Sequence, residues 1–174
     1  MSRSINKDRK NDMNNRYKMP EWKFRHAGGG NGCFTIIDNL EDVSKSLGHP
    51  SSIIIKYISI GFGCNCKENS ITGHQNREDL DKIIDSYIQN FIICPQCQLP
   101  ELIPYIVGKK KKKSLSVRCS ACGYDGKLTN MDKNYIKGEK LIMKHIEKNG
   151  WQVVKGSMVE QNNLKKDDFD PFNL

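Results

Sequence analysis

Four cysteines in two matched pairs constrain the fold of this chain more than any other feature of its sequence. Two residues lie inside each pair and 21 residues separate the pairs, which are Cys94 with Cys97 and Cys119 with Cys122. This spacing places both sulfurs of a pair on one turn, and two facing turns form the tetrahedron of thiolates that suits zinc. We therefore predict a zinc ribbon in which these four cysteines hold one structural zinc ion, and we expect the function to reside elsewhere in the chain.

The remaining cysteines favour a reducing compartment. The chain has 7 cysteines in 174 residues, an odd number, and no apolar run near its N-terminus is long enough for a signal peptide or a membrane helix. We therefore expect metal ligands and free thiols rather than disulfides, a cytoplasmic location and no contact with membranes. Cys64 and Cys66 look like a ligand pair, but with one intervening residue and no matching pair they are better explained as small strand residues.

The charge of the chain favours a polyanionic partner. The formal net charge is +8 and the isoelectric point is about 9.1. Zinc on four thiolates would leave a charge of about +6, and RNA is the obvious cytosolic polyanion. The alternative is that the basic residues only confer solubility. Hydrophobic residues make up 37 % of the chain, which predicts a modest core with disordered tails.

Apolar periodicity predicts an α+β protein. We expect a small α/β domain with a mixed sheet and packed helices, followed by the zinc ribbon and a C-terminal helix, in a monomer. The expected boundaries are a flexible arm over residues 1–15, the α/β domain over 16–92, the ribbon over 93–128, the helix over 129–150 and a tail over 151–174.

Individual elements can be predicted within these boundaries. Helices are expected over 40–47, with Asn39 as N-cap, over 77–91 and over 135–149. The isoleucine-rich run 53–60 fits a helix and a buried strand equally well. Strands are expected at 22–26 and 33–37, and in the ribbon at 103–107 and 115–117.

Two segments have residue types that occur in phosphate-binding sites. The glycine cluster 28–32 lacks the lysine and hydroxyl residue of a nucleotide-binding loop, so a hairpin turn is favoured over a phosphate cradle. Five consecutive lysines would form the tip of the ribbon. These lysines are Lys109, Lys110, Lys111, Lys112 and Lys113. They are equally consistent with a solvated surface and with a salt-sensitive contact to RNA phosphates.

The segment 16–20, Arg-Tyr-Lys-Met-Pro, lies where the expected arm meets the first strand. Composition alone favours a structural explanation, in which Tyr17 and Met19 pack on the core and Pro20 sets the direction of the chain. An arginine at such a place can also reach into a partner protein.

These motifs together resemble a known family. Arg16-Tyr-Lys-Met-Pro20, Gly30-Asn-Gly32, Lys56-Tyr57 and the two cysteine pairs occur in the order found in the eukaryotic translation initiation factor 5 family. The resemblance covers about residues 14–149, the N-terminal domain of that family. The ribbon and the helix before it are shared with the beta subunit of initiation factor 2.

The resemblance implies a GTPase-activating protein with no catalytic site of its own. It implies that Arg16 acts in trans, as an arginine finger, on the GTP-bound gamma subunit of initiation factor 2. The expected docking residues are Lys18, Lys56, Asn31 and Gly32. The implied setting is the small ribosomal subunit, with its rRNA and initiator tRNA. A guanidinium supplied in trans stabilises the charge that phosphoryl transfer gathers on the transferring group.

Departures from the family pattern leave two other functions open. Gly29 and Phe34 stand where the family has lysines, and we expect the family's helical C-terminal domain to be absent. One alternative is therefore a module that binds RNA or the initiation complex without activating a GTPase. The other is a subunit similar to the beta subunit of initiation factor 2.

Overall fold

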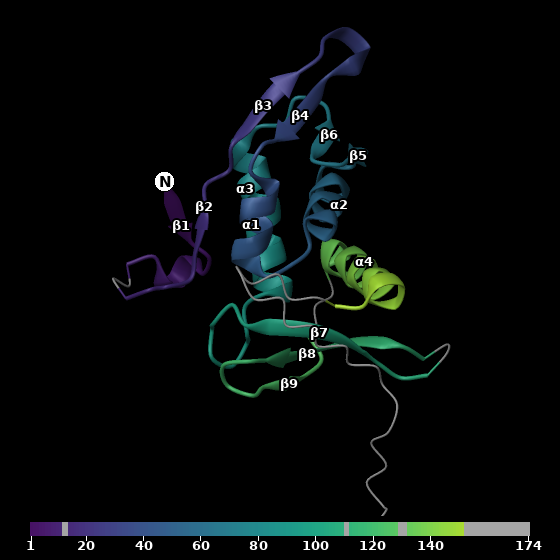
Figure 1. Cartoon of the computed structure of the whole chain (residues 1–174). Coiled ribbons are helices and arrows are strands. Elements are labelled where there is room, and N and C mark those ends of the chain that lie inside the picture. The colour runs from purple at the N-terminus through teal and green to yellow at the C-terminus, as the bar shows by residue number, and fades with distance from the viewer. Residues whose placement is uncertain (12–13, 110–111, 129–131, 152–174) are drawn as a thin grey trace, which may run out of the picture.

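The computed structural model describes residues 1–11, 14–109, 112–128 and 132–151. The molecule is elongated, with a four-stranded sheet at one end, helices in the middle and a three-stranded ribbon at the other end (Figure 1). Its strands are β1 Ser2–Ser4, β2 Lys18–Pro20, β3 Phe24–Ala27, β4 Phe34–Ile37, β5 Cys66–Lys67, β6 Ser70–Thr72, β7 Leu102–Val107, β8 Ser114–Cys119 and β9 Asp125–Gly126. Its helices are α1 Leu40–Leu47, α2 Ser51–Phe62, α3 Arg77–Phe91 and α4 Lys133–Asn149, with short 3-10 helices at Lys7–Arg9 and Gly30–Gly32.

The four-stranded sheet has the order β3-β4-β6-β5, and every strand pair in it is antiparallel. The predicted α+β fold with a ribbon and a C-terminal helix is confirmed, but the prediction that the sheet is mixed is wrong. The reason lies in the connections: β3 to β4 and β5 to β6 are hairpins, and α1 and α2 together return the chain to the sheet. The 3-10 helix at Gly30–Gly32 forms the first hairpin's turn, which confirms the hairpin prediction for the glycine cluster.

Helix α2 resolves the ambiguity of the isoleucine run. Three consecutive isoleucines, at 53–55, are all buried, as are Tyr57 and Ile58. The helix packs against α1, α3, α4 and the sheet, so it is apolar on nearly every side and shows no single helical stripe. The amphipathic helices α1 and α3, which each expose one face, lie where they were predicted.

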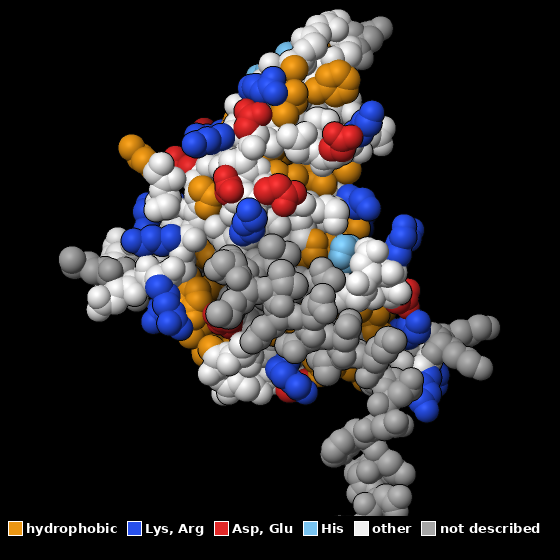
Figure 2. All heavy atoms as spheres, in the orientation of Figure 1, with side chains coloured by type: hydrophobic (Ala, Val, Ile, Leu, Met, Phe, Trp, Pro, Cys, Tyr) orange, Lys and Arg blue, Asp and Glu red, His pale blue; other side chains and the backbone are white. Residues whose placement is uncertain are grey.

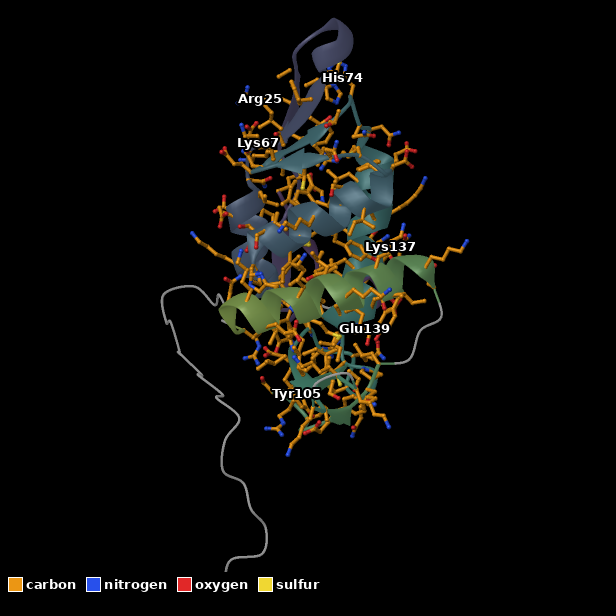
Figure 3. The ribbon with its side chains drawn as sticks, turned by 90° about the vertical axis from the view of Figure 1, so that its right-hand side faces the viewer. Arg25, Lys67, His74, Tyr105, Lys137 and Glu139 are labelled. Atoms are coloured by element: carbon orange, nitrogen blue, oxygen red, sulfur yellow. The ribbon has the colours of Figure 1, made fainter. Side chains whose placement is uncertain are left out.

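Helix α4 joins the two ends of the molecule. It lies across the middle of the structure, with the upper helices on one side and the ribbon on the other (Figure 3). Gly138 allows this crossing, because a Cβ atom there would lie 2.7 Å from ring carbons of both Phe91 and Tyr57. Tyr135 stacks on Phe91 with ring centroids 5.1 Å apart, and Ile142 is completely buried.

The N-terminal segment is folded rather than a flexible arm. Strand β1 pairs antiparallel with β2, so that Arg3 lies opposite Met19. Ile5 is buried in the same hydrophobic cluster as the helices. The expectation of a flexible arm over 1–15 therefore disagrees with the structure, because a strand of three residues and a single isoleucine give no periodicity to detect.

The ribbon consists of the antiparallel strands β7, β8 and β9. The first two match the predicted strands, whereas β9 has only two residues and was not predicted. Asn39 does precede α1, but it makes no capping hydrogen bond. Its side chain accepts from the Lys23 backbone amide and donates to the Glu21 carbonyl, which fixes the chain before β3.

The expected tail over 151–174 lies outside the described residues, apart from Trp151. Within the described part of the chain, no helix combines the length and the apolar character needed to cross a bilayer.

Candidate metal centre and arginine segment

The four paired cysteines come together at one end of the ribbon. The Sγ atoms of Cys94 and Cys122 are 3.6 Å apart, as are those of Cys97 and Cys119, and all four lie within 4.8 Å of one another. Four thiolates placed about 2.3 Å from a tetrahedral ion are separated by roughly 3.8 Å. The cluster therefore has the size and shape needed to hold one metal ion, as the sequence predicted.

Two similar turns present these sulfurs. The Gln98 amide donates to the Cys94 carbonyl over 3.0 Å, and the Gly123 amide donates to the Cys119 carbonyl over 3.1 Å. Gln98 and Gly123 both have left-handed backbones, with φ of 59° and 75°. Glycine adopts this conformation without strain, whereas a glutamine does so only when its surroundings hold it there.

The four thiols differ in their surroundings, and therefore in how easily they ionise. Burial raises the pKa of the Cys94 thiol and raises the pKa of the Cys97 thiol to about 12, whereas a backbone hydrogen bond from Tyr124 lowers the pKa of Cys122. A divalent cation would supply the positive charge that keeps such thiols ionised. Among the cysteine, histidine and acidic side chains of the described residues, these four cysteines are the group whose ligand atoms lie close enough together to hold a metal.

Arg16 is exposed on the segment that leads into β2. Its guanidinium donates to the Tyr17 hydroxyl over 3.2 Å and lies 5.2 Å from the centre of the Tyr17 ring. That hydrogen bond raises the pKa of Arg16, with a smaller contribution from the charge of Glu101. The neighbouring residues Asn15 and Met19 are buried, so the arginine projects from an anchored backbone.

Of the other predicted docking residues, the structure places only Lys18 on the same segment as Arg16. Lys18 is exposed on the same segment, and Lys56 is exposed on α2. Asn31 and Gly32 lie in the hairpin turn at the far end of the molecule from the ribbon (Figure 1). These residues can therefore contact different parts of a large partner, but they do not form one compact site.

The lysines at the tip of the ribbon are only partly described. Lys109 and Lys112 are exposed, and Lys113 forms an ion pair with Glu147 of α4 over 2.6 Å. Lys110 and Lys111 lie outside the described residues. Lys and Arg side chains are spread over the visible face, including its left edge where β1 and β2 lie (Figure 2).

Sequence reasoning missed the contacts that hold the Arg16 segment. Asn6, which is buried, donates through its Nδ2 to the Gln98 carbonyl over 2.9 Å. Arg3 lies 3.3 Å from carboxylate oxygens of both Asp81 and Asp85 on α3. These pairs span about 80 to 90 positions in the chain, so no local sequence pattern could have indicated them.

Comparison with known proteins places the chain in a family. The family described as the domain found in initiation factors 2B and 5 matches residues 6–125. Eukaryotic translation initiation factor 5 of Mus musculus is 33 % identical over 132 residues, which are 72 % of this chain and 30 % of the relative. The Drosophila melanogaster factor is 32 % identical over 127 residues, covering 67 % of this chain and 26 % of the relative.

A probable eukaryotic translation initiation factor 5 of Schizosaccharomyces pombe is 32 % identical over 117 residues, which are 64 % of this chain and 29 % of that protein. The chain thus spans less than a third of the length of these relatives. The matched residues 6–125 include Arg16 and all four cysteines of the metal centre. This chain therefore belongs to the family that carries the domain found in initiation factors 2B and 5.

Proposed function

We propose that this protein is a translation initiation factor that stimulates GTP hydrolysis by the gamma subunit of initiation factor 2. The match of residues 6–125 to the domain found in initiation factors 2B and 5, the similarity to factor 5 proteins and an exposed Arg16 on an anchored backbone support the proposal. The protein would act in trans, as a monomer in the cytoplasm, on the GTP-bound gamma subunit. Its setting would be the small ribosomal subunit, with its rRNA and initiator tRNA.

In this proposal the Arg16 guanidinium enters the GTPase site and stabilises the negative charge of the transferring phosphoryl group. Its bond to the Tyr17 hydroxyl is on the protein surface and can be exchanged for phosphate oxygens. Lys18 lies beside it to contact the GTPase or RNA. Lys56, Asn31 and Gly32 would dock on other parts of the complex.

The metal in the proposal is a structural zinc ion. A set of four thiolates is soft and closed, which suits zinc and leaves no open position for a substrate. Cys94, Cys97, Cys119 and Cys122 would hold it, and its role would be to stabilise the ribbon. The described tip lysines Lys109, Lys112 and Lys113 would supply weak, salt-sensitive contacts to RNA phosphates.

Single-turnover GTP hydrolysis in reconstituted initiation complexes tests the proposal. An arginine finger contributes on the order of 10³-fold or more to the rate, so Arg16→Ala should lose at least that factor, and Arg16→Lys should recover only part of it. Arg25→Ala is the matched control, because Arg25 is an exposed arginine on β3 that pairs with Asp38. If Arg16→Ala is as active as the wild type, the mechanism is wrong.

Two other functions remain candidates for specific reasons. Gly29 and Phe34 replace lysines of the family pattern, which favours a module that binds RNA or the initiation complex without activating a GTPase. Ribosome binding by the wild type without any stimulation of hydrolysis would identify this case. The second candidate is a subunit similar to the beta subunit of initiation factor 2, because the matching domain is not confined to factor 5. Stable co-purification with a gamma subunit in the absence of ribosomes would identify a subunit of that kind.

A further inference from the structure

The segment that carries Arg16 is tied to residues 4–9 by hydrogen bonds from Ile5 and to Ser4. The Ile5 amide donates to the Tyr17 carbonyl over 3.1 Å. The Asn15 side chain donates to the Ser4 hydroxyl over 2.6 Å, and its oxygen accepts from the Tyr17 amide over 3.0 Å. Any shift of residues 4–9 therefore moves the backbone on both sides of Arg16.

Residues 4–9 are in turn held by the rest of the molecule in two ways. On one side, Lys7 and the adjacent Arg3 form ion pairs with Asp85 of α3. On the other side, Asn6 donates to the carbonyl of Gln98. Asn6 is only 2 % exposed, so this hydrogen bond is shielded from water and has no solvent substitute.

Gln98 belongs to the metal centre. It directly follows Cys97, it adopts the strained left-handed conformation, and its amide donates to the Cys94 carbonyl. The Cys94 amide in turn donates to the Leu99 carbonyl over 2.9 Å. The position of the Gln98 carbonyl is therefore set by the turn that places Cys94 and Cys97 on a metal.

We propose that Asn6 is a positioning residue that couples the metal centre to Arg16. This inference rests on the proposed function of Arg16. A metal held by Cys94 and Cys97 would fix the turn around Gln98, Gln98 would fix Asn6, and residues 4–9 would fix the backbone around Arg16. The cysteine cluster thus does more than stabilise the ribbon, because it determines whether the arginine is presented in an ordered state.

Two variants isolate the contact between Asn6 and Gln98. Asn6→Asp keeps the side-chain oxygen that accepts from the Asp8 amide but loses the donor to Gln98. Asn6→Ser keeps a residue suited to this cap without burying a charge, so it serves if the aspartate variant does not fold. Asn69→Asp is a control for the loss of a side-chain amide donor at an exposed position, because Asn69 Nδ2 donates to the Ile37 carbonyl over 3.2 Å at the other end of the molecule.

The first measurement is single-turnover GTP hydrolysis with a titration of the factor, alongside the wild type and Arg16→Ala. Both Asn6 variants should lower the maximal rate about tenfold with less than a twofold change in the half-saturating concentration, and Asn69→Asp should change neither. Wild-type rates for both Asn6 variants, with Arg16→Ala inactive, would overturn the inference and leave the proposed function intact.

The second measurement needs no GTPase, so it tests the coupling between the metal centre and the Arg16 segment even if the wild type does not stimulate hydrolysis. Heteronuclear NOE values report the mobility of the Tyr17 and Lys18 amides in the full chain. They should fall in the Asn6 variants, and in the wild type when a chelator removes zinc, whereas chelation of the Asn6 variants should add little. Unchanged values after zinc removal from the wild type would refute the coupling.

Discussion

The buried side chain of His49 should make the stability of the protein depend on pH. The ring is 1 % exposed, at the junction of α1 and α2. Its Nδ1 lies 2.7 Å from the Tyr87 hydroxyl, and the Trp151 ring meets it edge-on with centroids 4.8 Å apart. Burial lowers the pKa of His49 to about 3.

The sign and size of the effect follow from this lowered pKa. In the unfolded chain the pKa of histidine is about 6.5, so between pH 6.5 and pH 3 the unfolded state binds more protons than the folded state. The free energy of unfolding therefore falls as the pH falls. From pH 7.5 to pH 5.5 the loss is about 1.4 kcal/mol, and this value holds for any folded pKa well below 5.5.

The assay is urea unfolding at pH 7.5 and pH 5.5 with saturating zinc, for the wild type and for His49→Gln. Glutamine keeps a polar group near Tyr87 but does not titrate. The loss of stability on acidification should be about 1.4 kcal/mol smaller in His49→Gln than in the wild type. His26→Gln, at an exposed histidine of β3, controls for a general loss of positive charge. Equal losses in the wild type and His49→Gln would refute the reasoning.

Two further predictions concern the crossing of α4 and the metal centre. Gly138→Ala should destabilise the protein in urea unfolding although alanine favours helices by about 1 kcal/mol, because overpacking against the two rings of α2 and α3 costs about 1–3 kcal/mol. Lys140→Ala, on an exposed position of the same helix, should be nearly neutral, and a stabilised Gly138→Ala would contradict the packing. Cys119→Ser should lower the zinc content of the purified protein and weaken ribosome binding. Loss of hydrolysis with zinc content and binding intact would contradict a structural role for the metal.

The amphipathic helices, and the turns marked by glycine or by paired cysteines, could be predicted from the sequence. Helices α1 and α3 each bury one stripe, and Gly48 ends α1 with φ of 69°. The paired cysteines and the glycine hairpin depend on residues close together in the chain. In each case a local pattern carries the structural information.

Other parts depend on contacts that no local pattern encodes. The run 53–60 was ambiguous because α2 is surrounded by packed elements. A glycine inside a helix, such as Gly138, ordinarily indicates only a weaker helix, whereas here it is required by two rings that lie 47 and 81 residues earlier in the chain. The anchoring of the N-terminal segment was missed because Asn6 and Gln98 are 92 positions apart.

The place of α4 in the fold has a consequence for synthesis. The rings of Tyr57 and Phe91 belong to the first part of the chain, yet they are covered by Tyr135 and Gly138. Domains fold in order as the chain leaves the ribosome. Here one side of the α/β core stays uncovered until α4 has emerged. Because the ribbon precedes α4 in the sequence, the ribbon is synthesised before the core is complete. A nascent chain that stalls within the ribbon would therefore expose an aromatic surface to chaperones.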